Sequence, residues 1–384
     1  MKLRRLGKTE LQVSEIGFGG EWLERHPEED GIDLIHYASA QGINILDCWM
    51  PDPKSRDIIG KGIKDNRRQW YIQGHIGSTW KDEQYFRTRD MKYVRPAFED
   101  LLRRLQTDYI DLGMIHYVDS EKEWEQMQHS DYLGYVTELK NSGVIRHIGM
   151  SSHNPKVARK AAESGYVEMI LFSINPAFDM LPASENIDTM FAETFDAGLK
   201  GTDPVRAKLY RICEENDVGI TVMKGFAGGR LFDEKRSPFG VRLSPVQCIH
   251  YALTRPAVSA IMCGYDTKEQ VDQAVAYETA SNDETDYASA LKNSISSVSS
   301  GSSEEELLSV CKDFESYFVE EVLKEVKENL ISDDDEDKDS SLSTLTDFHM
   351  DSTIELMADE IVDQVGENYT QQLYEQMKRN YGIE

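Results

Sequence analysis

Eight short apolar runs alternate with stretches of helical periodicity over residues 1–290, and this alternation limits the folds open to the chain. The strand candidates are Glu15–Gly19, Ile43–Cys48, Trp70–His75, Ile110–His116, Ile145–Ser151, Met169–Asn175, Gly219–Gly225 and Ala260–Gly264. The helix candidates are Gly31–Ala40, Lys54–Lys64, Asp90–Leu105, Tyr132–Ser142, Pro155–Ser164, Pro204–Glu215, Ser244–Thr254 and Thr267–Ala276. Such alternation is typical of parallel strands joined by crossover helices. It predicts the α/β fold class and a (β/α)8 TIM barrel, with an N-terminal hairpin from Leu3–Leu6 and Leu11–Val13 closing one end.

Polar residues close four of the apolar runs. These runs lead into Asp47, His75, His116 and the segment Ser151–His153. The carboxyl ends of barrel strands form the mouth at which barrel enzymes build their active sites. We therefore expect these side chains to meet at one mouth. For any single histidine, a hydrogen-bonded polar group with no role in chemistry is the alternative.

The composition changes near residue 290, which predicts a second part of the chain. Residues 291–303 are rich in Ser and Gly and resemble a flexible linker. Residues 291–384 hold 24 of the 69 acidic residues but only 7 of the 42 basic ones. Two amphipathic stretches, interrupted by the acidic run Asp333–Asp337, indicate a small all-α, partly disordered C-terminal module over 304–384. The predicted barrel domain is 1–290.

Charge and cysteine usage exclude some classes of partner and site. The net charge of −27 argues against nucleic acid or an anionic membrane surface as a partner, because both attract basic patches. The five cysteines are Cys48, Cys213, Cys248, Cys263 and Cys311, and no two of them form a CxxC pair. This spacing favours a reducing compartment. With no signal-peptide core and no apolar run of about 20 residues, the chain is expected to be cytoplasmic.

Several segments together resemble the aldo-keto reductases. They are Leu6–Thr9, Val13–Gly19, Gly42–Asp47, Thr107–His116 and Gly143–Ser151. Val222–Gly229 resembles the seventh strand and loop of the bacterial branch that usually carries a ferredoxin-like tail. The cysteine-rich tail of that branch is absent here. The resemblance covers about residues 1–290 and implies an oxidoreductase that reduces a small carbonyl substrate with NADPH.

The last part of the chain resembles a different family. Leu308–Glu320 and Leu373–Tyr381 are similar to the flagellar rod-binding domain, which helps to assemble the rod and is not catalytic. This resemblance implies a flagellar rod protein as a possible partner of residues 304–384.

The reductase resemblance places four catalytic positions on this sequence. Family members use a Tyr as general acid, a Lys and an Asp that lower its pKa, and a His that orients the carbonyl. Asp47 and His116 match the Asp and the His, whereas Asp52 stands at the Tyr position and His75 at the Lys position. A carboxyl group with a pKa of about 3.9 is normally ionised where a phenol is not. Either Asp47 raises the pKa of Asp52, or His75 serves as the acid. Loss of the family's chemistry is the alternative.

The cofactor positions are also mixed. The resemblance places Ser151 and Ser152 at the nicotinamide end of the cofactor. It implies further contacts from Asn175, Lys224, Gly228, Gly229, Gly264 and Tyr265. The Arg and Asn that often bind the adenosine 2′-phosphate align with Gln270 and Ala274. The sequence therefore leaves NADP and NAD both open as cofactors.

Two other classes of function remain open from the same residues. Asp47, Asp52, His75 and His116, with His153 or Cys48 nearby, have the composition of a Zn²⁺ or Fe²⁺ site. The barrel could also be a non-catalytic scaffold that carries the C-terminal module.

Overall fold

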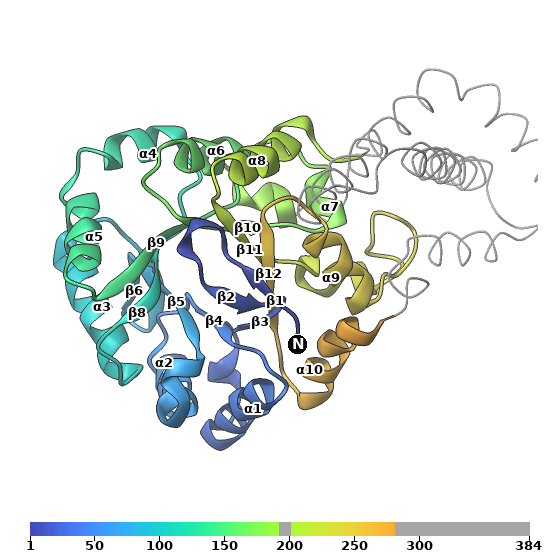
Figure 1. The fold of residues 1–384 in the computed structure, drawn as a ribbon, viewed down its shortest axis with the longest axis horizontal. Coiled ribbons are helices and arrows are strands. Elements are labelled where there is room, and N and C mark those ends of the chain that lie inside the picture. The colour runs from blue at the N-terminus through green and yellow to red at the C-terminus, as the bar shows by residue number, and fades with distance from the viewer. Residues whose placement is uncertain (192–200, 281–384) are drawn as a thin grey trace, which may run out of the picture. The chain divides into compact units, whose positions relative to one another are not determined.

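The structure is a computed structural model that describes residues 1–191 and 201–280 (Figure 1). These residues belong to a unit that runs from Met1 to Ser281. The strands are β1 (Leu3–Arg5), β2 (Gln12–Ser14), β3 (Ile16–Gly19), β4 (Ile45–Cys48), β5 (Tyr71–Ile76), β6 (Ser78–Lys81), β7 (Gln84–Arg87), β8 (Ile110–Ile115), β9 (Ile145–Ser152), β10 (Met169–Ser173), β11 (Gly219–Met223) and β12 (Val258–Gly264). The α-helices are α1 (Glu28–Ala40), α2 (Pro53–Ile63), α3 (Met91–Arg104), α4 (Glu121–Met127), α5 (Asp131–Asn141), α6 (Pro155–Glu163), α7 (Pro176–Asp179), α8 (Pro204–Glu215), α9 (Pro245–Leu253) and α10 (Lys268–Val275).

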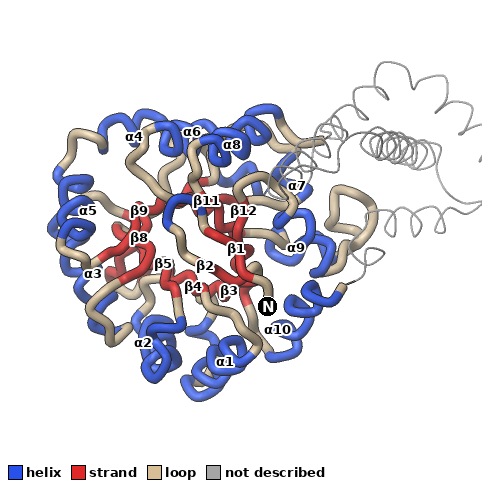
Figure 2. Tube along the Cα trace, viewed as in Figure 1, coloured by secondary structure: helices blue, strands red, loops and turns tan. Residues whose placement is uncertain are grey.

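Eight parallel strands close into a barrel. Their order around it is β10, β11, β12, β3, β4, β5, β8 and β9. Figure 2 shows these strands at the centre and the helices in a ring outside them. The predicted (β/α)8 barrel is therefore confirmed, and each predicted barrel strand overlaps an observed one. The expected linker (291–303) and C-terminal module (304–384) lie outside the described residues.

The N-terminal hairpin covers the amino-terminal end of the barrel, as predicted. Strands β1 and β2 pair antiparallel, and the N–H of Lys8 donates to the carbonyl of Asp217, just before β11. Leu6 and Val13 of the hairpin pack with apolar side chains from inside the barrel, among them Met114 and Met169. This burial of apolar surface stabilises the hairpin against the end of the barrel.

A recurrent dipeptide starts several of the helices. Helices α2, α6, α7, α8 and α9 each begin with Pro, directly after a residue whose side chain accepts a backbone N–H. Those capping residues are Asp52, Asn154, Asn175, Asp203 and Ser244. Proline at the first helical position loses no hydrogen bond, and the capping side chain satisfies a free N–H group. The capping role decides what two of the candidate site residues can do, as described below.

The sequence did not predict one pair of strands. Strands β6 and β7 form an antiparallel hairpin directly after β5, at the carboxyl end of the barrel. Its turn residues, Asp82 and Glu83, both have positive φ angles, of 50° and 58°. Glycine or asparagine usually occupies such positions, so the sequence carries no strong turn signal there. Within the described residues, no helix is both long and apolar enough to cross a membrane.

Candidate active site

Three of the four expected catalytic residues form an unbroken series of hydrogen bonds. The Nε2 atom of His75 lies 2.9 Å from Oδ1 of Asp47, and its Nδ1 atom lies 2.7 Å from Nδ1 of His116. Asp47 lies on β4, His75 on β5, and His116 follows β8, so three neighbouring barrel strands contribute one residue each. All three side chains are buried. The structure thus brings them together at the carboxyl ends of the strands.

Tyr85 continues this series toward solvent. Its hydroxyl oxygen lies 2.7 Å from Nε2 of His116. Tyr85 belongs to β7 and is 37 % exposed, whereas His116 is 4 % exposed. We call Asp47, His75, His116 and Tyr85 the polar line. It runs from the barrel interior to the surface of the mouth.

Two further side chains support the buried end of the polar line. The amide of Gln73 donates to Oδ1 of Asp47 at 2.8 Å, and the hydroxyl of Thr221 donates to the amide oxygen of Gln73 at 2.8 Å. Gln73 and Thr221 are fully buried. Since Thr221 lies on β11, these contacts cross the barrel interior and fix the position of the Asp47 carboxylate. The sequence analysis did not identify either residue.

Burial sets the protonation of the outer half of the polar line. Burial, followed by the positive charges of Arg89 and Arg87, holds the pKa of His116 well below its usual 6.5. Burial also raises the pKa of Tyr85 to about 12. At neutral pH His116 is therefore a neutral imidazole, and Tyr85 keeps its proton.

The hydrogen bonds of the polar line have a single consistent direction in this state. An ionised Asp47 can only accept, so Nε2–H of His75 donates to it. The Nδ1 atom of His75 then accepts from Nδ1–H of His116, and Nε2 of His116 accepts from the hydroxyl of Tyr85. All these polar atoms have partners, which buried groups require. The series can pass a proton along its whole length if each bond reverses.

Asp52 does not belong to the polar line. Its carboxylate accepts the backbone N–H of Ser55 at 2.8 Å and caps α2, and Pro53 follows it. Sequence alignment placed Asp52 at the family's Tyr position, but the Asp-Pro start of α2 directs its side chain to the helix end. The structure therefore brings together three of the four residues, Asp47, His75 and His116, and leaves Asp52 apart.

The geometry does not favour the metal alternative. Across residues 1–191 and 201–280, no group of three or more His, Cys, Asp or Glu side chains is arranged to hold a metal ion. Asp47, His75 and His116 bond to one another in series instead of converging on a shared point. His153 bonds through Nδ1 to Asp119 at 3.0 Å, and Cys48 is a buried free thiol.

Three of the expected cofactor residues share one loop at the mouth. Lys224 follows β11, and Gly228 and Gly229 have φ angles of 65° and 81°. A Cβ atom added to either glycine would meet nothing within 4 Å, so open space lies beside this backbone. Burial lowers the pKa of Lys224, whereas the negative charges of Glu21 and Asp119 oppose that shift. The loop therefore offers a cation and accessible backbone to a ligand.

The other expected cofactor residues are engaged within the protein or lie apart from this loop. The hydroxyl of Ser151 accepts the N–H of Tyr117, and the hydroxyl of Ser152 donates to Asp119. Asn175 caps α7 and donates to the carbonyl of Lys224. The hydroxyl of Tyr265 donates to the carbonyl of Gly17. Gly264 is exposed at the end of β12.

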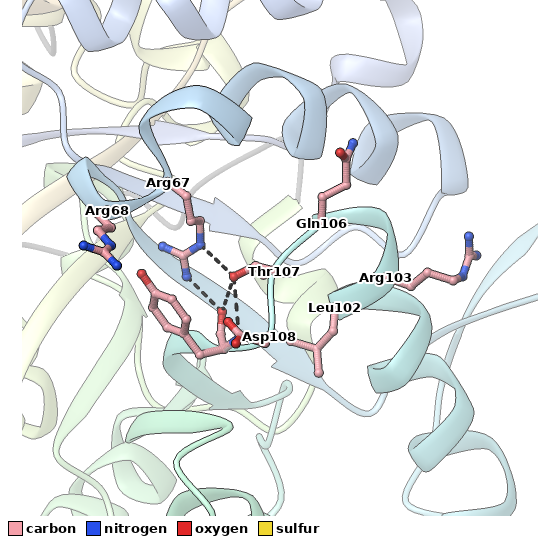
Figure 3. A pocket seen from close by; sticks show the side chains of 8 residues that line it. Arg67, Arg68, Leu102, Arg103, Gln106, Thr107 and Asp108 are labelled. Carbon is pink, nitrogen blue, oxygen red and sulfur yellow. Dashed lines mark hydrogen bonds between the residues drawn. The ribbon is translucent and has the colours of Figure 1, made fainter.

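An open pocket of about 620 Å³ lies at the opposite end of the barrel (Figure 3). It is lined by residues that precede β5 and β8, including Arg67 and Thr107. Arg67 donates to Thr107, to the carbonyl of Tyr109 and to the carboxylate of Asp111. Its guanidinium thus ties the starts of two strands together. Active sites of (β/α)8 barrels lie at the carboxyl ends of the strands, whereas this pocket lies at their amino ends. We therefore interpret it as a surface feature without a catalytic role.

Comparison with known proteins identifies the family. The model of the aldo/keto reductase family matches residues 15–330. An uncharacterized oxidoreductase of Bacillus subtilis, YqkF, is 28 % identical over 186 residues, which are 47 % of this chain and 58 % of the relative. The aldo-keto reductase YhdN of the same organism is 31 % identical over 161 residues, or 40 % of this chain and 47 % of the relative. The chain therefore spans about half of the length of these curated relatives.

Solved structures share the fold. The holo form of aldo-keto reductase AKR11C1 from Bacillus halodurans matches with a TM-score of 0.59 and 23 % identity, over 74 % of this chain and 94 % of that protein. An aldo-keto reductase from Klebsiella pneumoniae in complex with NADPH matches with a TM-score of 0.50 and 16 % identity, over 73 % of this chain and 90 % of that protein. At these identities the likeness concerns the barrel alone. On the extent of the family match, this chain belongs to the aldo/keto reductase family.

Proposed function

We propose that the barrel is an NAD(P)H-dependent oxidoreductase that reduces a small carbonyl substrate. The polar line is the observation that carries this proposal. Carbonyl reduction requires a proton at the substrate oxygen as well as a hydride at the carbon. A series of hydrogen bonds from buried Asp47 to half-exposed Tyr85 provides a route for that proton at the mouth of the barrel.

The mouth has features that fit a dinucleotide. Lys224 is a half-buried cation that has no ion pair or side-chain hydrogen bond among the described residues, and Gly228 and Gly229 leave open space beside their backbone. These three residues would hold phosphate groups of the cofactor, because an ammonium group and backbone N–H groups both favour phosphate. A bound dihydronicotinamide would supply the hydride. The Klebsiella pneumoniae aldo-keto reductase of similar fold, solved in complex with NADPH, supports this choice of cofactor.

Gln270 bears on the choice between NADP and NAD. Gln270 stands where the family often has an Arg for the 2′-phosphate. Its side-chain oxygen accepts the N–H of Asp266 at 2.6 Å, at the start of α10. An amide used in this way adds no positive charge for a 2′-phosphate. We therefore propose that both NADPH and NADH bind.

The test is direct binding and turnover with the purified full chain. Titration of the intrinsic tryptophan fluorescence with NADPH and with NADH measures binding. Loss of dihydronicotinamide absorbance in the presence of aldehydes and quinones measures turnover. Binding of at least one dinucleotide, with turnover of at least one carbonyl, is the expected result. A protein that binds neither dinucleotide would exclude the reductase function. Stoichiometric metal in the same preparation would then favour the metal-dependent alternative, and no metal would favour the non-catalytic scaffold.

We propose that the protein is cytoplasmic. The cysteines within the described residues, Cys48, Cys213, Cys248 and Cys263, are all free and buried, which supports this location.

We also propose that residues 304–384 bind a flagellar rod protein, on the resemblance of Leu308–Glu320 and Leu373–Tyr381 alone. The family match reaches residue 330 and so covers the first of these two stretches. Co-purification of rod proteins with the full chain, but not with residues 1–290, is the expected result.

A further inference from the structure

We propose that Tyr85, on the β6–β7 hairpin, is the catalytic residue that gives the proton to the substrate oxygen. This inference rests on the reductase function proposed above and names the acid for it. No tyrosine stands at the family's usual position, which is occupied by Asp52. The structure places a different phenol at the outer end of the polar line, from a hairpin that the sequence did not predict.

The positions of the four residues leave Tyr85 as the proton donor. Both ring nitrogens of His75 are bonded within the protein, to Asp47 and to His116. The Nδ1 atom of His116 bonds to His75, and its Nε2 atom bonds to Tyr85. Among these side chains, only the phenol combines a bond to the line with substantial exposure, at 37 %. A substrate at the mouth therefore meets Tyr85 before it can reach either histidine.

The hairpin is anchored on both sides, which holds the phenol in place. The hydroxyl of Ser78 donates to the carbonyl of Trp49, just after β4, at 2.6 Å. On the other side, Arg87 donates to the carbonyl of Tyr117 at 2.8 Å. Such anchoring reduces the entropy that a general acid would lose on reaching its working position.

Neighbouring groups fix the position of Tyr85 and His116 further. Arg89 donates to the carbonyl of His116 at 2.5 Å. The ring of Trp49 is stacked with His116, with centroids 6.1 Å apart, and meets Tyr85 edge-on at 5.4 Å. The turn after β8 and the hairpin thus form one packed unit around the bond between phenol and imidazole.

The proton balance of the step follows from the directions of the hydrogen bonds. Before reduction the polar line takes up one proton from water. The added proton makes His75 an imidazolium, which donates through Nε2–H to the carboxylate of Asp47 and through Nδ1–H to Nδ1 of His116, while Nε2–H of His116 donates to the oxygen of Tyr85. The hydroxyl of Tyr85 is left to donate to the substrate oxygen.

Reduction returns the line to its resting state. A bound dihydronicotinamide would supply a hydride that forms the new C–H bond as the C=O π bond breaks, and would itself be left oxidised. The substrate oxygen takes the proton of Tyr85, and the protons between His75 and Tyr85 each move one position outward. His75 is again a neutral imidazole, and the hydroxyl of Tyr85 again donates to His116. Oxidation of an alcohol runs through the same positions in reverse.

This scheme predicts how the rate depends on pH. The charged side chains nearest to Tyr85 and His116 are Arg87 and Arg89, and both arginines pair with the carboxylate of Glu123. Loading adds one proton to the line: the two arginines oppose it, whereas the carboxylate of Glu123 and that of Asp119, which is bonded to His153, favour it. The rate of reduction should therefore increase as the pH falls below neutrality, whereas alcohol oxidation should increase as the pH rises.

The test compares Tyr85→Phe with Tyr93→Phe in the full chain. Tyr93, on α3, packs its ring edge-on against Phe86, the neighbour of Tyr85 on β7, with ring centroids 5.9 Å apart. Its hydroxyl makes no hydrogen bond to the polar line. Tyr85→Phe should lower the turnover number for carbonyl reduction by roughly 10²–10⁴-fold, as for a lost general acid, and leave the Kd for NADPH unchanged. Tyr93→Phe should keep the turnover of the unmodified protein.

A second readout is independent of the cofactor. In protein labelled with ¹⁵N in histidine, Tyr85→Phe should shift the Nε2 resonance of His116, because that nitrogen loses its donor, and Tyr93→Phe should not. An unmodified protein that turns over carbonyls, together with a Tyr85→Phe variant that is equally active, would overturn the role of Tyr85 and leave the reductase function standing. An unchanged Nε2 resonance would overturn it as well. Failure of the unmodified protein to bind or oxidise NAD(P)H would overturn both proposals.

Discussion

The imidazole of His75 bridges Asp47 and His116, with Nε2 at 2.9 Å from the carboxylate of Asp47 and Nδ1 at 2.7 Å from Nδ1 of His116. The aldo-keto reductases that this chain resembles have a lysine here, which supplies a positive charge next to the aspartate. A histidine at the same position supplies two ring nitrogens, so it can accept a proton on one side and release one on the other. At this position a lysine supplies only a positive charge, whereas His75 can pass a proton between its two hydrogen-bond partners.

The bridging position predicts the effect of removing the imidazole while keeping hydrogen bonds. His75→Gln can still bond to Asp47 and to His116, but an amide does not pass a proton between them. The turnover number for carbonyl reduction should therefore fall, and by less than the roughly 10²–10⁴-fold expected for Tyr85→Phe, because the phenol keeps its own proton. Steady-state kinetics of both variants at several pH values provide the measurement. A larger loss in His75→Gln than in Tyr85→Phe would instead identify His75 as the direct donor.

The capping role of Asp52 predicts a change in stability without a change in chemistry. Asp52→Ala removes the acceptor for the N–H of Ser55 at the start of α2 and should lower the free energy of unfolding by about 1 kcal/mol. Asp52→Asn keeps an acceptor oxygen and should lose much less. Denaturant unfolding and carbonyl turnover are measured on both variants. If both lost turnover while remaining stable, Asp52 would have to be placed back among the catalytic residues.

The fold could be predicted because its signal is repeated. Eight apolar runs, each followed by a helical period, leave few alternatives to a barrel. Dipeptides such as Asp203-Pro204 and Ser244-Pro245 mark where helices begin. The hairpin over Ser78–Arg87 lacked such a signal, since Asp82 and Glu83 take left-handed conformations without a glycine.

The site could be predicted only in part, for a physical reason. Strand ends place side chains at the mouth, so Asp47, His75 and His116 could be grouped from the sequence. A position in a sequence does not reveal which way a side chain points. Asp52 turns to the end of a helix, and Ser152 turns to Asp119. Tyr85 lies on the β6–β7 hairpin and matches no position of the family's catalytic pattern, so the resemblance offered no reason to select it.

The depressed pKa of His116 predicts a loss of stability in mild acid. The unfolded chain takes up a proton on this histidine as the pH falls through its usual 6.5, but the folded protein, in which burial lowers the pKa, does not. Stability is therefore fully present above pH 6.5 and decreases below it, by up to about 1.4 kcal/mol per pH unit for one such group. Burial lowers the pKa of His153 too, so it acts in the same direction.

Denaturant unfolding between about pH 7 and pH 5 measures this slope, in a range above the usual titration of carboxyl groups. His116→Asn should reduce the slope, because one of the two histidines whose pKa burial lowers is gone. His36→Asn, which changes an exposed side chain on α1, serves as the control and should leave the slope unchanged. A slope in His116→Asn equal to that of the unmodified protein would show that His116 is not the source.

The charges around the mouth predict which substitutions weaken and which strengthen dinucleotide binding. The negative charge of Glu21 raises the pKa of Lys224, and burial raises the pKa of the Glu21 carboxyl. Lys224→Met removes a partner for cofactor phosphate and should raise the Kd for NADPH by roughly 10–150-fold, the equivalent of a charged hydrogen bond of about 1.5–3 kcal/mol. Glu21→Gln removes a negative charge near the same phosphate and should lower the Kd.

Lys61→Met, which breaks an exposed pair with Glu28 on the outside of the barrel, is the matched control. Fluorescence titration at low and at high salt gives the three values, and the difference between variants should shrink at high salt. Equal affinities in Lys224→Met and Lys61→Met would mean that Lys224 serves only to pack over Phe191, whose ring centre lies 5.2 Å from its Nζ atom.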